Sequence, residues 1–136
     1  MQTFNDSTGQ EWQLEVNGFT IKKVRTETDI VLTDLADLRG GEESVFVQLF
    51  SPPYVDLVAV LWSLCEEQAD VLDISPNKFA SHLGGVSLGD AAKALSRAVP
   101  EMFPDASQRK AIAAAMDALW DASEAIAKGA ADQIAD

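Results

Sequence analysis

The chain contains one histidine, His82, and one cysteine, Cys65, from which nucleophilic or acid–base chemistry would have to be built. A nucleophilic site needs a base within hydrogen-bond reach and a third group that orients this base. No acidic residue or second ligand stands at a useful helical spacing from His82, and Cys65 ends an apolar run that begins at Val60. We therefore expect no catalytic residue, and we interpret Cys65 as a small buried apolar group. A single cysteine also excludes an internal disulfide and a cysteine-rich zinc site.

Two short segments share only part of the pattern of known ligand-binding loops. Residues 84–90 are rich in glycine, but they lack the Gly-Lys-Ser/Thr ending of a phosphate loop and follow no predicted strand. Residues 70–75 carry aspartates without the central glycine and closing glutamate of an EF-hand calcium loop. We therefore expect a turn between two helices at residues 84–90, and neither a metal site nor a cofactor.

The charge of the chain is strongly acidic, with 22 acidic and 10 basic residues and a net charge of −12. Such a balance argues against binding of a nucleic-acid backbone. The densest basic cluster is Lys22, Lys23 and Arg25, which is either an exposed helix face or a contact for an acidic partner. The first residues lack the pattern of a secretory signal, and no run of about 18 apolar residues predicts a membrane span. We expect a cytoplasmic protein that does not enter the membrane.

The apolar period changes from strand-like to helical near residue 18. Turn residues 6–9 separate Phe4 from the alternating Trp12, Leu14 and Val16, which predicts a β-hairpin within residues 1–18. Residues 19–128 predict a helical body, and the alanine-rich residues 129–136 a frayed tail. The expected fold is a single mainly α domain over residues 1–136, a compact helical bundle with a short N-terminal β-hairpin. The sequence leaves open whether the hairpin packs on its own helices or on a neighbouring chain.

The body divides into helices at proline and glycine residues and at residues that favour helix ends. Residues 29–38 are compatible with a short helix or an extended link. The predicted helices are one capped by Thr20 and ending near Thr28, then Glu42–Phe50, Pro53–Asp70, a short helix capped by Ser75, Ser87–Phe103 with a kink or early stop at Pro100, and a last helix capped by Asp105 or Ser107 and ending at Lys128.

Aromatic side chains recur along the predicted helices, and most of them must belong to the core. A small body with several wide apolar stripes also offers surface to a partner helix, which is a known mode of recognition. The residues we select as partner contacts are Phe46, Phe50, Tyr54, Trp62 and Trp120.

Several short motifs spread over most of the chain carry a resemblance to a known class of proteins. They are Phe4-x-Asp6-x-x-Gly9-x-x-Trp12-x-Leu14-x-Val16, Ile21-Lys22-Lys23-Val24-Arg25, Leu61-Trp62-x-Leu64-Cys65, Ile74-Ser75-Pro76-x-x-Phe79, Ala91-Ala92-x-x-Leu95 and Met102-Phe103-Pro104. In these motifs the chain resembles the tail assembly chaperones of tailed phages and prophages. The resemblance implies a small, acidic, mainly helical protein without cofactors. It also implies binding to the tape measure protein, whose apolar helices stay soluble while the tail tube assembles.

The leading hypothesis is therefore a non-enzymatic tail assembly chaperone of the host cytoplasm, with the tape measure protein or another tail protein as its partner. A structural virion component, such as a connector or baseplate protein, is an alternative. A third hypothesis is an acidic inhibitor of a nucleic-acid-binding host protein. The sequence leaves open which protein is the partner and whether this chain is present in the mature virion. It also leaves the oligomeric state open, and a homo-oligomer is compatible with the sequence.

Overall fold

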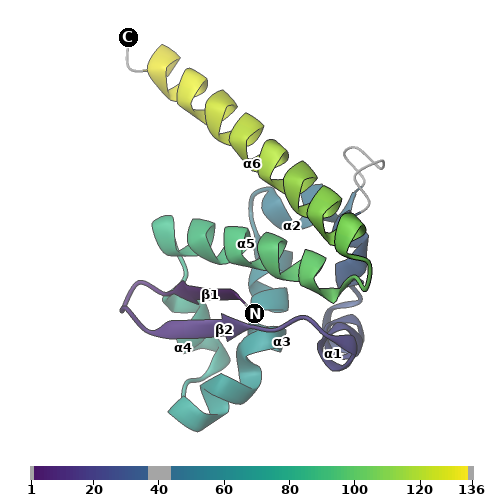
Figure 1. Cartoon of the computed structure of the whole chain (residues 1–136). Helices are drawn as coiled ribbons and strands as arrows, with labels where there is room; N and C mark the ends of the chain where they lie inside the picture. Colours follow the sequence, from purple (N-terminus) through teal and green to yellow (C-terminus); the bar gives the residue numbers. More distant parts are fainter. Residues whose placement is uncertain (1, 37–43, 135–136) are drawn as a thin grey trace.

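The computed structural model describes residues 2–36 and 44–134, and it is mainly helical with a short N-terminal hairpin (Figure 1), as the sequence predicts. Its elements are β1 (Gln2–Asn5), β2 (Glu11–Leu14), α1 (Gly18–Thr28), the 3-10 helix η1 (Leu32–Ala36), α2 (Val45–Phe50), α3 (Val55–Leu72), α4 (Pro76–Ser81), α5 (Val86–Ala98), the 3-10 helix η3 (Val99–Met102) and α6 (Ala106–Ile134).

The hairpin packs on the helices of its own chain. β1 and β2 are antiparallel, with Phe4 opposite Trp12, and β1 lies against α5 while β2 lies against α3 (Figure 1). The side chain of Gln68 on α3 covers the outer edge of β2, because its oxygen accepts from the backbone N–H of Gln13 (3.1 Å) and its amide donates to the carbonyl of Glu11 (2.8 Å). An exposed strand edge invites pairing with other chains, and this contact satisfies part of that edge.

The N-cap of helix α1 lies three residues before the cap predicted from the sequence. Asn17 is the N-cap, and its side chain accepts from the backbone N–H of Thr20 at 3.0 Å. Thr20 returns the bond, since its hydroxyl accepts from the backbone N–H of Asn17 at 2.8 Å. The prediction of Thr20 as the cap is therefore wrong: it is the third helical residue of a capping box.

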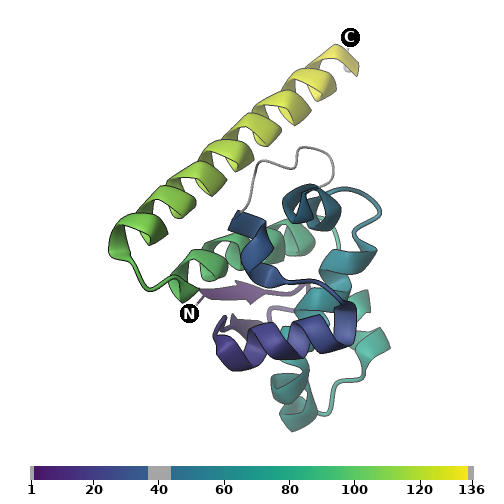
Figure 2. The same ribbon diagram turned by 90° about the vertical axis from the view of Figure 1, so that its right-hand side faces the viewer.

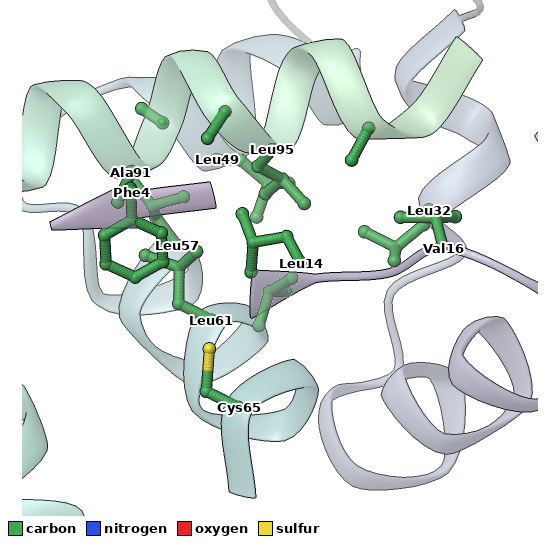
Figure 3. Close-up of a cluster of buried hydrophobic side chains, with 14 of the residues drawn as sticks. Phe4, Leu14, Val16, Leu32, Leu49, Leu57, Leu61, Cys65, Ala91 and Leu95 are labelled. Atoms are coloured by element: carbon green, nitrogen blue, oxygen red, sulfur yellow. The ribbon is translucent and has the colours of Figure 1, made fainter. Parts of the chain in front are cut away.

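Helix α3 crosses the middle of the core, as its wide apolar stripe predicts. It starts at Val55 and ends at Leu72, two residues later at each end than predicted. Leu57, Leu61 and Cys65 lie on its inner face, where they meet side chains of β1, β2, α2 and α5 (Figure 3). The hydrophobic core is thus built around one long helix that contacts both the hairpin and its helical cover.

Short elements connect the hairpin to this helix. The segment that the sequence left open contains the 3-10 helix η1, with Leu32 and Leu35 buried. Helix α2 starts at Val45, and the hydroxyl of its N-cap Ser44 accepts from the backbone N–H of Val47 at 3.2 Å. The predicted start at Glu42 lies outside the described residues.

Two proline positions shape the second half as predicted. Ser75 caps α4, with its hydroxyl accepting from the backbone N–H of Lys78 at 3.2 Å and Pro76 in the first turn. Helix α5 ends at Ala98 and continues as the 3-10 helix η3 around Pro100. Proline lacks the backbone N–H that an α-helix needs at this point, which explains the early stop.

Helix α6 packs on η3 and α5 at its start and then extends past the body (Figure 2). Asp105 caps it, since its carboxylate accepts from the backbone N–H of Gln108 at 3.0 Å. The segment expected to fray, residues 129–136, is helical as far as Ile134. One glycine in a helix costs only about 1 kcal/mol, and the alanines around Gly129 favour helix.

Candidate partner-binding groove

Three aromatic side chains from α2 and α6 form a cluster at the surface of the body. The ring centroids of Phe46 and Phe50 are 4.8 Å apart, and that of Trp120 lies 5.1 Å from Phe50 and 6.0 Å from Phe46. These separations are typical of favourable aromatic pairs. All three side chains are only partly buried, so the cluster contributes to packing and still presents ring surface to the solvent.

A groove of about 330 Å³ adjoins this cluster, between the start of α3, the first half of α5 and the middle of α6. Its lining is mostly apolar and consists of Phe50, Tyr54, Leu57, Gly85, Leu88, Gly89, Ala92 and Trp120. The volume is near the lower end of the range of about 300–1,000 Å³ in which proteins hold ligands. It suits one or two bulky apolar side chains of a partner better than a polar cofactor.

Glycines keep one side of the groove open. A Cβ atom placed on Gly89 would meet no other atom within 4 Å, and the same is true of Gly85. Gly85 also precedes α5 with a φ of +56°, a conformation that other residues rarely adopt. The absence of side chains at these two positions leaves room beside Trp120 and Tyr54.

Tyr54 enters the groove from a constrained turn. It is the N-cap of α3 and has a φ of +64°. The preceding turn contains the cis peptide Pro52-Pro53, and the backbone N–H of Tyr54 donates to the carbonyl of Ser51 at 3.1 Å. Left-handed backbone at a residue other than glycine costs about 1–3 kcal/mol and is concentrated at functional sites. Asp29 and Asp73 share this conformation at the ends of α1 and α3, and Tyr54 is the aromatic residue that adopts it in the described part of the chain.

Trp120 is held in place by a hydrogen bond to α5. Its indole N–H donates to the hydroxyl of Ser96 at 2.8 Å, and that hydroxyl donates in turn to the carbonyl of Lys93 at 2.8 Å. Ser96 is fully buried, whereas Trp120 remains partly exposed. The bond fixes the polar edge of the indole ring, so that its apolar face is pre-oriented at the groove.

Four of the five partner contacts predicted from the sequence gather here, and Trp62 does not line this groove. Phe50, Tyr54 and Trp120 line the groove, and Phe46 packs behind Phe50 and Trp120. Trp62 packs instead on Phe79 of α4, with their centroids 5.5 Å apart.

The groove also contains residues that sequence reasoning missed, namely Leu57, Leu88, Ala92 and the two glycines. Residues 84–90 are predicted as a turn, and a helix is predicted from Ser87. The structure starts α5 at Val86, so the helix start is right to within one residue, and the turn is wrong beyond Gly85. The signal that was available is the spacing of four between Gly85 and Gly89, which leaves one helix face without side chains.

The residues first considered for chemistry lie elsewhere. Cys65 is buried among leucines (Figure 3), and this burial raises the pKa of its thiol to about 12, which disfavours the reactive thiolate. The Nδ1 atom of His82 lies 3.7 Å from a carboxylate oxygen of Asp6, beneath the hairpin turn. In the described part of the chain no three acidic, histidine or cysteine side chains are arranged to hold a metal ion.

Asp6 is the centre of a structural cluster at that turn. Its carboxylate accepts from the Thr8 hydroxyl (2.6 Å), the backbone N–H groups of Thr8 (2.9 Å) and Gln10 (3.1 Å), and the indole N–H of Trp12 (3.0 Å). Burial alone would raise the pKa of Asp6, but these donors outweigh it and hold the pKa below its ordinary value. A carboxylate with so many internal donors stabilises the turn and has few lone pairs left for a substrate.

Comparisons of the chain with protein-family models, with curated proteins and with solved structures gave no match. In residues 2–36 and 44–134, none of the helices combines the length and the apolar character that crossing a bilayer requires. The groove therefore has to be interpreted from its own geometry.

Proposed function

We propose that this protein is a non-enzymatic tail assembly chaperone of a tailed phage, acting in the host cytoplasm on apolar helices of the tape measure protein. The observation that carries the proposal is the open apolar groove beside Trp120, Phe50 and Tyr54. Aromatic side chains with their polar ends fixed are typical anchors of protein interfaces. The resemblance found in the sequence supplies the partner, and the groove supplies a surface on which it would bind.

The groove also defines the kind of helix that would bind. Its volume accommodates one or two large apolar side chains, such as a pair four residues apart on an amphipathic helix. Asp90 and Asp121 are exposed and follow the groove residues Gly89 and Trp120 in the sequence, but neither lines the groove. Because the chain has a net charge of −12, we expect a partner helix with basic residues beside its apolar anchors. The acidic exterior of the complex would keep it in solution.

We expect a tape measure protein to be encoded beside this chain, and co-expression of the two proteins tests the proposal. The two proteins should be recovered as a soluble complex, while the tape measure protein alone should be insoluble. The decisive variant is Gly89→Leu, because it fills the groove at a position where the fold leaves open space. A matched control is Ala111→Leu, which adds similar apolar volume at an exposed position of α6 that does not line the groove.

We expect Gly89→Leu to abolish recovery of the complex and Ala111→Leu to retain it. Equal insolubility of the tape measure protein with and without this chain would contradict the function. A complex that survives Gly89→Leu unchanged would contradict the groove as its site. Mass spectrometry of purified particles separates a chaperone, which should be absent from them, from a structural virion protein.

A further inference from the structure

Two exposed surfaces outside the groove combine apolar side chains with opposite charge. One is the face of α1 formed by Phe19, Lys22, Lys23 and Thr26, called here the basic surface. The other is the end of α3 with Glu67, Asp70, Val71, Leu72 and Asp73, called here the acidic surface. Phe19 is 64% exposed, Val71 86% and Leu72 40%, so each surface presents apolar area to the solvent.

The basic surface has a hollow that an apolar side chain can enter. It measures about 350 Å³ and is lined by Phe19, Lys22, Lys23, Thr26 and Glu27. Lys23 already pairs with Glu66 of α3 at 3.3 Å. Lys22 and, at the edge of this surface, Arg25 are exposed, and neither forms an ion pair within residues 2–36 and 44–134. These two cations are therefore available to a partner in a chain with an excess of acids.

The acidic surface is electrostatically unfavourable in the isolated chain. The carboxyl end of a helix carries a partial negative charge and is stabilised by cations. The last turn of α3 has no basic residue, and Glu67, Asp70 and Asp73 are all exposed there. Lys78 of α4 is the cation that shares a hollow with Asp70 and Asp73. One lysine leaves an excess of negative charge around the exposed Val71.

In residues 2–36 and 44–134 no ion pair joins the basic surface to Glu67, Asp70 or Asp73. Figure 1 shows α1 on one side of the body and the end of α3 at the bottom, and Figure 2 confirms that the end of α3 lies below α1. Glu67, Asp70 and Val71 share one helix face by their spacing of three and four, as do Phe19, Lys22 and Lys23. The face of α3 therefore presents Val71 together with carboxylates, and the face of α1 presents Phe19 together with lysines. Glu27, which also lines the hollow on α1, accepts a hydrogen bond from the hydroxyl of Ser63 at 2.6 Å.

We propose that the occupant of the basic surface is a second copy of this chain, bound through its acidic surface. Val71 of one copy enters the hollow beside Phe19 of the other, while Asp70 and Glu67 approach Lys22. The argument for a second copy is that this chain carries both complementary halves, and that Lys22, Glu67 and Asp70 form no ion pair within the described residues. Because the two surfaces differ, a single contact joins the acidic surface of one copy to the basic surface of the next. The assembly closes as a dimer only if each of two copies binds the other through both of its surfaces. The proposal does not depend on the function of the groove.

Sedimentation equilibrium of the full chain over a range of concentrations tests this contact. The wild type should have an average mass above the monomer mass of 14.6 kDa. Lys22→Glu and Asp70→Lys should each weaken the association at least about tenfold, because each places like charges opposite one another. The double variant should restore the wild-type affinity to within about threefold, because it exchanges the two charges across the contact.

A matched control is Lys110→Glu, which changes the net charge as Lys22→Glu does but lies at an exposed position on α6. We expect this control and the groove variant Gly89→Leu to associate like the wild type, and Val71→Ser to associate as weakly as Asp70→Lys. Circular dichroism verifies that each variant is folded. A monomer at every concentration, an association unaffected by the single charge reversals, or a failure of the double variant to restore it would overturn the proposal.

Discussion

Two tryptophans of this chain each donate the indole N–H to a side chain, but one lies in the core and the other at the surface. Trp12 in the hairpin donates its indole N–H to Asp6 at 3.0 Å and is 0% exposed, and its ring packs edge-to-face with Phe79 at a centroid separation of 4.9 Å. Trp120 on α6 donates to Ser96 at 2.8 Å and remains partly exposed beside the groove. In both cases the polar edge of the ring is satisfied, so hydrogen bonding does not distinguish a core tryptophan from a surface one.

The difference lies in what covers the apolar faces of the two rings. Trp12 is enclosed by the hairpin, α3 and α4, and its partner is a carboxylate with three further donors. Trp120 is packed by Phe46 and Phe50 on one side and adjoins open space at the groove. We infer that the hairpin region maintains the fold, whereas the groove region keeps ring surface available for binding. The predictions below test this division.

The largest effect is expected for Trp12→Ala. Removing a fully buried tryptophan costs about 3–5 kcal/mol, and here it also leaves one donor of the Asp6 cluster missing. Unfolding in urea, followed by circular dichroism, measures this loss directly. A loss below about 1 kcal/mol would contradict the assignment of Trp12 to the central core.

Asp6→Asn should be the next most destabilising change, by about 3 kcal/mol at neutral pH. The amide group offers one acceptor oxygen where the carboxylate offers two, so buried donors are left unpaired. The folded-state pKa of Asp6 lies below its ordinary value of 3.8, so its stabilising effect is complete above that value and is lost as pH falls through the folded-state pKa. The wild type should therefore lose its advantage over Asp6→Asn in acid.

Urea unfolding of both proteins at about pH 7 and about pH 2.5 measures that difference. Both proteins contain all the other carboxylates, so the contribution of these groups to the pH dependence cancels in the difference between the two unfolding free energies. A gap in unfolding free energy that is the same at the two pH values would show that the carboxylate charge of Asp6 does not stabilise the hairpin turn.

The two regions also differ in how far the sequence alone predicts them. The alternation of Trp12, Leu14 and Val16 predicts a buried strand face, and Asp6 is recognisable as a turn residue that binds nearby amides. Trp12, Leu14 and Val16 are all buried, although β2 ends at Leu14, and Asp6 accepts from the backbone N–H groups of Thr8 and Gln10. The bond between Asp6 and the Trp12 indole is not predictable from spacing, because it depends on the register that places Phe4 opposite Trp12.

The groove is less accessible to sequence reasoning. Helical spacing identifies apolar stripes, but it does not determine which stripes of different helices meet. Trp62 shows the difficulty, since it lies on the same helix as Leu57 and yet packs on Phe79, while Leu57 lines the groove. The role of Gly89 is harder still to foresee, because a groove is defined partly by side chains that are absent.

Trp120→Ala should destabilise the fold by about 2 kcal/mol, roughly half the effect of Trp12→Ala, because its ring is only partly buried. The hydroxyl of Ser96 keeps its bond to the carbonyl of Lys93, so no buried donor is left unpaired. If the groove binds apolar helices, the same variant should lose capture of the tape measure protein in co-expression. A stability loss equal to that of Trp12→Ala would contradict the division between the two regions.

The smallest effects should come from two glycines, and they should have opposite signs. A Cβ atom at Gly9 or at Gly89 meets nothing within 4 Å, so crowding plays no part at either position. Gly9 in the hairpin turn has a φ of +87°, where alanine is strained, and Gly9→Ala should cost about 1 kcal/mol. Gly89 lies within α5, where alanine is the better helix former, so Gly89→Ala should stabilise by about 0.5–1 kcal/mol. Thermal unfolding of both variants measures the pair. A glycine that weakens its helix but leaves a groove open is expected where selection favours binding over stability. If Gly89→Ala is no more stable than the wild type, Gly89 does not weaken α5, and this explanation for the glycine is wrong.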